Sequence, residues 1–468
     1  MSERLVGVSE ANRGCSIREE LAAGPLGDRR LDARRDRLIE RLEAHPDRGF
    51  PALCEDDAEV EALYRFLRNP RVSAARLLAP HIAATQARCA EAGPVLVVHD
   101  TTDMVFPGEG ARAGLTRLPG GRHGFVVHAA LAVAADGTRT PLGVLRLQPW
   151  VRRAPVPGKR DRDRYKASNK ESLEWQHAVA EVRTALGGAQ LMHVMDRGAD
   201  SYELLADWVA QQDRFIVRLT HDRVVEEAAR LSTALARAPT VCQRDVPLAR
   251  RSDRHRTLSD RTRHPARDGR LATLRIAGRA LTLRRPTHAV GPTTLAVHVV
   301  LVEEVDGPAN VEPVRWWLAT TEPIDTPEQL LHIVDAYRTR WVIEEYFKAL
   351  KTGCAYEKRQ LESLQTLLIA LALLAPIAWR LLALRSVARA HPDHKATTVL
   401  SRRQVHLLGT TKAGALLHAT PSVALALAAL ARLGGHLRQN GPPGWLVLHR
   451  GFQKLRDMEL GWVAAGGK

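Results

Sequence analysis

The sequence predicts an α/β protein that folds into more than one domain. Its 468 residues exceed the roughly 100–200 residues that one domain usually takes. Short β-branched segments precede and follow a helical segment in the middle of the chain, which is the order of an α/β sheet. Hydrophobic residues make up 45% of the chain and charged residues 26%. This composition is that of a folded globular protein and excludes a disordered or fibrous one.

Residues 1–72 are expected to form a helical N-terminal region. Apolar side chains recur there at helical spacing and would share one face, namely Leu31, Leu38, Ile39 and Leu42. A stripe of arginines, interleaved with acidic residues, lies beside that face and consists of Arg30, Arg34, Arg37 and Arg41. The stripe is typical both of a solvated helix surface and of a helix that contacts phosphates, and we weigh the two interpretations equally.

The central region, residues 73–386, is expected to hold the sheet. Strands are predicted on both sides of a helix at 201–211, and they cover residues 94–100, 125–134, 142–147, 190–196 and 214–219. A β-rich insertion follows at about 224–312, and strands resume at 294–303 and 314–320. The segment 244–285 contains 13 Arg and four Asp. We therefore expect a basic loop around Arg250 to Arg270.

The C-terminal part of the chain is expected to be helical. A long helix is predicted from about Thr326, because Asp325-Thr-Pro-Glu328 supplies N-cap, proline and early-acid signals. Apolar helices should follow near 362–390 and 421–433, the second of them in a C-terminal region at 387–468. The longest apolar run has 13 residues and contains Pro376, whereas a membrane span needs about 20 residues. We expect a buried core helix there and no membrane partner.

The charge balance points to a polyanionic partner. The chain has 68 Lys and Arg against 52 Asp and Glu, for a net charge of +16, which suits nucleic acid or an anionic membrane surface. Its five cysteines are scattered and form no C-x-x-C pair, which argues against a disulfide scaffold or a zinc ribbon and fits a reducing compartment. The N-terminal residues lack an apolar signal segment, so a cytoplasmic location is expected.

Three acidic residues are candidates for the chemistry. Asp100 and Asp196 each end a predicted strand, where open α/β sheets bind ligands, and Glu344 lies on the predicted long helix. A cluster of carboxylates suits Mg²⁺ or Mn²⁺ rather than Zn²⁺. Two such ions, about 3.5–4 Å apart, would relieve the repulsion between the carboxylates. They could also activate water on one side of a phosphodiester and stabilise the leaving oxygen on the other.

The predicted long helix places further polar residues beside Glu344. Tyr337, Arg340, Glu344 and Lys351 are spaced three, four and seven apart, so on one continuous helix they would share a face. Arginine, lysine and tyrosine are all partners for phosphate oxygens. An ordinary charged helix surface would carry a similar set, because Glu–Lys pairs at helical spacing are common.

The spacing Tyr337-x2-Arg340-x3-Glu344-x6-Lys351 resembles the Y-R-E-K signature of Tn-five-type DDE transposases, insertion-sequence family four. The resemblance extends over most of the chain in the same order. It includes Leu26-Gly-Asp-x-Arg30, Asp100-Thr-Thr102, Lys170-Glu-Ser-x-x-Trp175, Asp196-Arg-x-Ala-Asp200 and Arg315-Trp-Trp-Leu318. An ordered series of this length is much more specific than one short motif.

The resemblance implies a ribonuclease-H-like catalytic core in which Asp100, Asp196 and Glu344 bind two Mg²⁺ ions, with Mn²⁺ as a substitute. It implies cut-and-paste transposition, in which double-stranded transposon ends are nicked, closed into hairpins, reopened and joined to target DNA. It further implies that residues 1–72 bind the ends, that residues 387–468 form a dimerisation region, and that a homodimer pairs the two ends. Such an enzyme would act in the bacterial cytoplasm, at the nucleoid.

The resemblance also assigns DNA contacts, to Tyr337, Arg340, Lys351, Trp316 and Arg218. Trp316 would stack on an extruded base, with Trp317 as the alternative, since neighbouring strand residues face opposite sides. From the residues alone, Arg30 and Arg34 are further candidates. Asp200 is expected to cap a turn or pair with Arg197, and Gly198 stands where some relatives carry an acid.

Two other functions remain open at this point. One is a catalytically idle DNA-binding relative that acts as an inhibitor or a domesticated protein. Because Asp100, Asp196 and Glu344 are all retained, the sequence favours the active enzyme. The other is a repair or recombination nuclease with the same core, against which the complete Y-R-E-K set argues.

Overall fold

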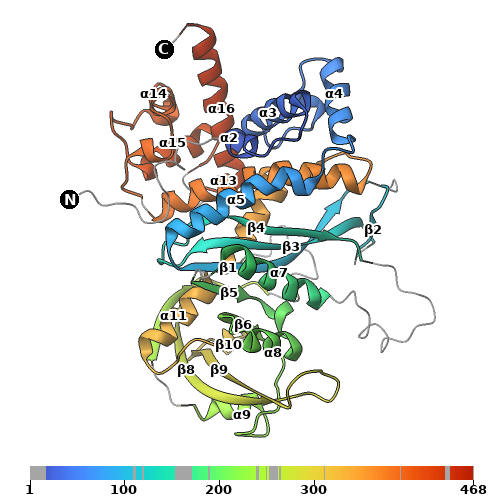
Figure 1. The fold of residues 1–468 in the computed structure, drawn as a ribbon. Helices are drawn as coiled ribbons and strands as arrows, with labels where there is room; N and C mark the ends of the chain where they lie inside the picture. The colour runs from blue at the N-terminus through green and yellow to red at the C-terminus, as the bar shows by residue number, and fades with distance from the viewer. Residues whose placement is uncertain are drawn as a thin grey trace. The chain divides into compact units, whose positions relative to one another are not determined.

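The computed structural model describes residues 17–108, 112–118, 121–152, 171–187, 190–238, 242–248, 250–251, 262, 265–309, 311–390, 392–437 and 443–466. The chain forms two compact units. Unit 1 consists of Met1–Lys170, His177–Gln190 and Trp341–Lys468, and unit 2 consists of Glu171–Gln176 and Leu191–Arg340. Each unit is described by itself (Figure 1).

Unit 1 begins with short helices whose starts are set by side-chain caps. They are α2 (Ile17–Ala22), α3 (Arg29–Ala44), the 3-10 turn η1 (Pro51–Leu53), α4 (Asp57–Leu67) and α5 (Ala74–Ala92). Asp28, Asp56 and Ser73 each accept a hydrogen bond from a backbone N–H of the helix that follows, as N-cap residues do. The apolar face expected on α3 is buried, which confirms that part of the helical pattern.

The sheet of unit 1 is antiparallel and centres on β3 (His123–Ala134). One edge of β3 pairs along its whole length with β1 (Val95–Phe106), and the other edge pairs with β4 (Pro141–Trp150) and with the short β2 (Thr116–Arg117). Helices α5 and α13 (Leu364–Ala390) lie side by side against β4 (Figure 1). Both faces of this sheet's core are therefore apolar, and β3 is buried almost throughout.

Helix α13 is the predicted apolar core helix. It contains Pro376 and includes a 23-residue stretch, Leu364–Ser386, long and apolar enough to cross a membrane. In the most apolar part of this stretch, 72% is buried inside the protein. The Trp379 indole also donates a hydrogen bond to the Pro141 carbonyl at 2.9 Å. A helix packed this way against its own sheet is a core helix of the fold.

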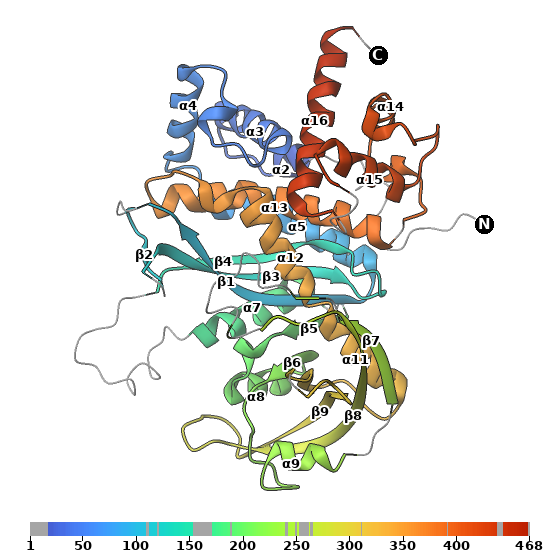
Figure 2. The same ribbon diagram turned by 180° about the vertical axis from the view of Figure 1, so that it is seen from behind.

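The part of the chain just before α13 consists of short helical pieces. In unit 1 these are α12 (Trp341–Lys348), the π-helical turn η3 (Ala349–Gly353) and the 3-10 turn η4 (Tyr356–Lys358). Helix α12 packs on β1 (Figure 2). Helix α7 (Glu171–Leu186) begins in unit 2 and continues into unit 1.

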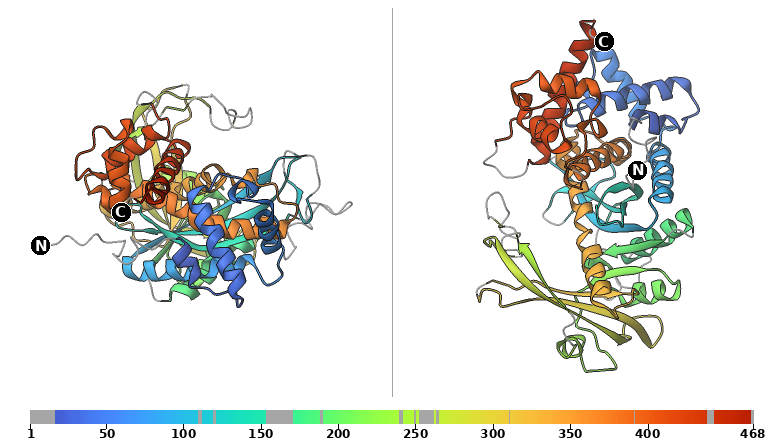
Figure 3. Two further views of the ribbon diagram at one scale, coloured as in Figure 1. Left: turned by 90° about the horizontal axis from the view of Figure 1, so that it is seen from above. Right: turned by 90° about the vertical axis from the view of Figure 1, so that its left-hand side faces the viewer.

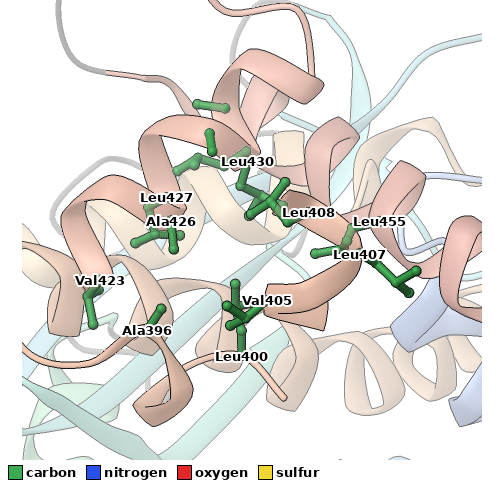
Figure 4. Close-up of a cluster of buried hydrophobic side chains, with 13 residues drawn as sticks. Ala396, Leu400, Val405, Leu407, Leu408, Val423, Ala426, Leu427, Leu430 and Leu455 are labelled. Carbon is green, nitrogen blue, oxygen red and sulfur yellow. The ribbon is translucent and has the colours of Figure 1, made fainter. Parts of the chain in front are cut away.

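The C-terminal helices of unit 1 surround a separate hydrophobic cluster (Figure 4). They are the 3-10 turn η5 (Ala396–Thr398), α14 (Arg402–Gly409), the 3-10 turn η6 (Lys412–Gly414), α15 (Val423–Leu433) and α16 (Trp445–Ala464). A Cβ atom at Gly451 would lie only 2.0 Å from the Leu430 carbonyl oxygen. Glycine at that position therefore lets α15 and α16 pack backbone to backbone.

Unit 2 contains a mixed sheet in the order β5-β6-β10-β9-β8-β7. Its strands are β5 (Leu191–Met195), β6 (Phe215–Leu219), β7 (Cys242–Leu248), β8 (Arg270–Arg284), β9 (Thr294–Val305) and β10 (Arg315–Thr320). Strands β5 and β6 are parallel, and α8 (Tyr202–Ala210) connects them. The remaining helical pieces are the 3-10 turn η2 (Arg197–Ala199), α9 (Leu231–Ala236) and α11 (Pro327–Arg338).

The predicted β-rich insertion is a long antiparallel arrangement of β7, β8 and β9 (Figure 3). Most of the basic loop expected around Arg250 to Arg270 lies outside the described residues. On the strands themselves, several of the arginines are paired with acids. Arg270 meets Glu304 at 2.9 Å and Arg275 meets Glu303 at 2.6 Å. Part of the positive charge of this insertion is therefore neutralised within the strands.

Candidate active site

The candidate residues are divided between the two units. Asp100, Glu344 and Lys351 belong to unit 1, and Asp196, Arg218, Trp316, Tyr337 and Arg340 belong to unit 2. Arg30 and Arg34 lie on α3 of unit 1. We describe each set within its own unit.

Asp100 lies in the middle of β1, and the expectation that the strand ends there is wrong. Residues 101–106 continue the antiparallel pairing with residues 123–128 of β3, because Thr101, Thr102 and Val105 are β-branched residues that favour a strand. Burial changes at this point: β1 is buried up to Asp100, and the next three side chains are half-buried. Asp100 is 9% exposed and its Oδ1 accepts the Thr101 N–H at 2.8 Å.

A buried histidine supports this part of β1. His128 lies opposite Thr101 in the β1–β3 register, and their Nδ1 and Oγ1 atoms are 3.0 Å apart. Burial, together with the nearby Arg146 charge, lowers the pKa of His128 to about 3. The ring is therefore neutral at neutral pH and fixes the strand by hydrogen bonding rather than by charge.

Lys351 is docked directly on the strand that carries Asp100. Its Nζ donates to the Thr102 hydroxyl at 2.9 Å and to the Asp103 carbonyl oxygen at 2.6 Å, and it lies 3.5 Å from the Glu357 carboxylate. Glu357 in turn accepts the Val105 N–H at 2.9 Å. The structure thus brings the last residue of the Y-R-E-K spacing to the segment of the first candidate acid.

The single long helix expected from Thr326 is wrong. Helix α11 starts at a Thr326 capping box as predicted, but it ends at Arg338, and α12 begins at Trp341. The Thr339 hydroxyl donates back to the Asp335 carbonyl at 3.1 Å, a bond that bends helices. The π-helical turn at Ala349–Gly353 then shifts the register again. Tyr337, Arg340, Glu344 and Lys351 therefore do not form one stripe on one helix.

Glu344 lies in the first turn of α12 and is half-buried. The helix is anchored by Ile343, Tyr346 and Phe347, which are buried. The neighbouring Glu345 is instead paired with Arg389 of α13 at 2.9 Å. The Glu345 carboxylate is thus held by an ion pair with α13.

Asp196 follows β5 directly, as the sequence predicted. It caps the short turn η2, and its Oδ1 accepts the Gly198 N–H at 2.8 Å. A Cβ atom at Gly198 would lie 3.0 Å from both that Oδ1 atom and the Trp175 ring. The absence of a side chain at Gly198 therefore lets Trp175 and Asp196 approach each other.

Asp200 is a structural carboxylate that pairs with Arg223, so the expected pairing with Arg197 is wrong. Its Oδ2 also accepts the backbone N–H groups of Thr220 and His221, at 2.6 and 2.9 Å. Burial alone would raise the pKa of Asp200, but Arg223 and these N–H groups lower it overall. The carboxylate is therefore ionised and its bonds hold η2 to the end of β6.

Unit 2 also gathers an aromatic and cationic cluster. Trp316 and Tyr337 meet edge to face, with ring centroids 5.3 Å apart, and the Arg218 guanidinium lies 6.0 Å from the Trp316 centroid. Burial raises the pKa of Tyr337, and the Asp196 charge adds to this, while Arg218 and Arg340 oppose it. Four predicted DNA contacts and one predicted metal ligand thus lie close enough to interact electrostatically.

The four arginines of the stripe on α3 differ in whether they form ion pairs. Arg41 and Arg37 pair with Glu59, at 2.5 and 3.6 Å, so the C-terminal half of the stripe is neutralised. The acids that interleave with the other half, Asp32 and Asp36, bind the buried Arg35 instead. Arg30 and Arg34 are exposed and make no ion pair with any residue in the described part of the chain.

The carboxylates have the right chemistry for hard divalent ions, which prefer oxygen ligands. Neither unit by itself brings three Asp, Glu, His or Cys side chains together among the described residues. Asp100 and Glu344 lie in unit 1, and Asp196 lies in unit 2.

Two residues near Lys351 were not identified as candidate site residues from the sequence. Glu357 and Arg152 both line a cleft beside β1 with Lys351. They belong to no motif, and more than 200 residues of sequence separate them. The packing of η4 on β1 and the ion pair between Arg152 and Asp103 bring them together.

Comparison with known proteins gives two family matches. Residues 16–72 match the model of the transposase DNA-binding family, and residues 160–379 match that of the transposase DDE domain. The second match contains Asp196 and Glu344, whereas Asp100 precedes it. Among solved structures, the chain is similar to piggyBac transposase in a synaptic complex with hairpin DNA. The identity is 10% and the TM-score 0.35, covering 83% of this chain and 70% of that chain.

Proposed function

We propose, from the premise that this chain combines a transposase DNA-binding domain with a DDE transposase domain, that it is a cut-and-paste transposase of the Tn-five type encoded by a bacterial insertion sequence. The observation that carries this proposal is the docking of Lys351 on Thr102 and Asp103, in the strand that carries Asp100. It joins one end of the Y-R-E-K spacing to the segment of the first candidate acid, although nothing local in the sequence requires it.

In the proposed mechanism Asp100, Asp196 and Glu344 of a ribonuclease-H-like core hold two divalent ions, Mg²⁺ or Mn²⁺. When bound, such ions supply an activated water and stabilise the leaving oxygen of a phosphodiester. The protein's own share is positioning. Arg340 and Lys351 neutralise phosphate oxygens, and the bonds from Lys351 to β1 keep its ammonium group beside Asp100.

Each proposed step is an in-line displacement at phosphorus, so one site can serve all of them. In the first, a water oxygen bonds to phosphorus at the transposon end and the bond to the 3′ oxygen breaks. The freed 3′ oxygen then bonds to a phosphorus of the opposite strand, the bond from that phosphorus to the 3′ oxygen of the flanking DNA breaks, and a hairpin forms. Water reopens the hairpin at the same phosphorus and releases the 3′ hydroxyl again. This hydroxyl finally attacks a phosphorus of target DNA, where the bond to a target 3′ oxygen breaks.

Recognition of the ends is assigned to residues 1–72, where Arg30 and Arg34 are free of protein partners among the described residues. Residues 73–386 would form the catalytic core with its insertion at about 224–312. Residues 387–468 would pair two protomers as a homodimer on two double-stranded ends. We place this activity at the nucleoid, in the bacterial cytoplasm.

The test is Glu344→Ala, with Glu345→Ala as the matched control. Both proteins are incubated with Mg²⁺ and DNA that carries the terminal repeats flanking the gene, and products are separated on a denaturing gel. Glu344→Ala should lose nicking, hairpin formation and strand transfer together and keep end binding. Glu345→Ala, whose side chain pairs with Arg389, should retain activity.

Two results would contradict the proposal. Normal strand transfer from pre-cut ends by Glu344→Ala would remove Glu344 from the active site. A parent protein that binds the repeats but cuts none of them in Mg²⁺ or Mn²⁺ would instead point to an idle, inhibitory relative. Ca²⁺ should support binding without cleavage, because its looser coordination disturbs in-line geometry.

A further inference from the structure

The cleft beside β1 has a volume of about 520 Å³. It begins at the residue after Asp100 and follows the strand, and its lining consists of Thr101, Thr102, Asp103, Val105, Arg122, Arg152, Lys351 and Glu357. All of these residues belong to unit 1. The lining is almost entirely polar, with three cationic and two anionic side chains.

The charges in this cleft do not cancel, and the surplus lies at one residue. Arg152 pairs with Asp103 at 3.3 Å, and Lys351 lies 3.5 Å from Glu357. The third cation, Arg122, is exposed and has no ion pair with any residue in the described ranges. An exposed arginine beside two neutralised pairs is the place where an anion would gain most.

The backbone holds Arg122 at the edge of the cleft. Its carbonyl accepts the Leu118 N–H at 2.8 Å, which closes the hairpin between β2 and β3. Two residues further on, a Cβ atom at Gly124 would lie 2.1 Å from the Met104 carbonyl oxygen. Glycine at that position therefore lets β3 lie tightly on β1, and Arg122 is fixed relative to the strand of Asp100.

The lining also selects the chemical class of the ligand. Among the described residues, no aromatic ring lines the cleft, so these residues offer no stacking platform for a base. Its donors are guanidinium, ammonium and hydroxyl groups, which bind phosphate oxygens. We propose that Arg122 binds a backbone phosphate of the DNA strand that enters this cleft beside Asp100, as a contact independent of base sequence.

This inference rests on the proposed function, because it assumes that DNA reaches Asp100. The experiment is the salt dependence of DNA binding by the full chain without divalent metal. One duplex carries the terminal repeat with flanking DNA, and a second duplex is scrambled. Each phosphate contact contributes about 0.9 to the slope of log Kobs against log salt concentration.

Arg122→Gln should reduce that slope by about 0.9, to the same extent on both duplexes. Arg122→Lys should retain the slope, because a lysine still supplies one point charge. The matched control is Arg117→Gln, on the other strand of the same hairpin. Arg117 is also exposed but does not line the cleft, so the slope should stay at the parent value.

An unchanged slope in Arg122→Gln, or an equal loss in Arg117→Gln, would overturn the assignment of Arg122. A loss confined to the repeat duplex would also overturn it, because it would indicate base reading rather than a phosphate contact. Failure of the proposed function has a different signature: the parent chain would bind the repeat no more tightly than the scrambled duplex. Thermal melting of each variant verifies that it is folded.

Discussion

At the scale of single residues, basic side chains divide into those that protein carboxylates already satisfy and those left for a partner. Arg223 forms an ion pair with Asp200, and Arg41 forms one with Glu59. Arg30, Arg34 and Arg122 are exposed without such partners among the described residues. The net charge of +16 already subtracts these acidic partners, so the exposed arginines without an ion pair mark the specific places where phosphates would bind.

The aromatic cluster gives a prediction about hairpin formation. Trp316 is half-buried and touches Tyr337 edge to face, so its other surface can receive an extruded base. Trp316→Ala should slow hairpin formation roughly tenfold and leave the first nick near the parent rate, because base–aromatic stacking is worth about 1–3 kcal/mol and only the hairpin step needs unstacking. Both rates are measured on a denaturing gel.

The control for this prediction is Trp317→Phe. Trp317 faces the other side of β10, and its buried indole nitrogen has no hydrogen-bond partner in the described part of the chain. Phenylalanine should therefore be tolerated there with little change in either rate. Equal slowing of nicking and hairpin formation in Trp316→Ala would indicate a folding defect and contradict the stacking role.

At the scale of elements, the segment after Arg340 is shaped by its irregular turns. The break at Thr339 and the π-helical turn at Ala349–Gly353 replace one straight helix. Ala355 then adopts a left-handed conformation with φ of 46°. Lys351 lies within the π-helical turn and donates hydrogen bonds to β1. Strain of this kind is common at functional sites.

Arg359 connects this segment to the N-terminal region. Its guanidinium is 2% exposed and donates to the carbonyls of Pro46 and Arg48, and to that of Cys354 at 2.8 Å. It also lies 5.0 Å from the Phe50 ring centroid. Burial lowers the pKa of Arg359. One side chain thus joins the region matched to DNA-binding domains to the turn that follows Lys351.

Arg359→Lys should destabilise the protein and lower the cleavage rate more than end binding. An ammonium group cannot reach three carbonyls as the planar guanidinium does, and each unsatisfied buried acceptor costs about 1–3 kcal/mol. Arg68→Lys is the control, since its bridge to Glu362 at 3.0 Å is 61% exposed on the arginine side. Thermal melting, end binding and single-turnover cleavage separate the effects. A variant that melts and cleaves like the control would contradict the connection.

At the scale of the whole molecule, the C-terminal helices form a cluster that is complete within one chain. The buried members of the cluster in Figure 4 all lie between Ala396 and Leu455. Helix α15 buries Val423, Leu427 and Leu430 against them, and Leu425 on its outer side is 39% exposed. The apolar helix therefore finds its cover in its own chain, and the dimerisation role of this region stays a prediction.

Deleting residues 391–468 tests that role. The cut follows the end of α13 at Ala390 and removes the C-terminal cluster as a whole, while β3 and the strands that pair with it lie outside the deleted residues. The truncated chain should bind single ends but form no complex with two ends and two chains, because a two-fold assembly needs its interface. Light scattering of the DNA complex measures this, and a truncated chain that still pairs two ends would show that the interface lies elsewhere.

The sequence by itself determined most of the elements. Apart from β1, which continues to Phe106, the strands and apolar helices that were predicted lie close to their predicted bounds. Thr326 caps its helix, and Asp196 follows its strand. These features depend on side-chain periodicity and on caps within a few residues, which a sequence displays directly. The candidate acids were found from their positions in the predicted elements, and the family resemblance implies that they form a metal-binding triad. No contact described within either unit tests that triad.

Only the tertiary structure decided which residues far apart in the sequence contact each other. Lys351 meets Thr102 across 249 residues, and Arg359 meets Arg48 across 311. The pairing of Asp200 with Arg223, the break at Thr339 and the cleft at Arg122 likewise depend on how elements pack. Such contacts leave no periodic trace in the sequence, because each partner sits in a locally ordinary context. Their energy appears only when burial removes water from both groups.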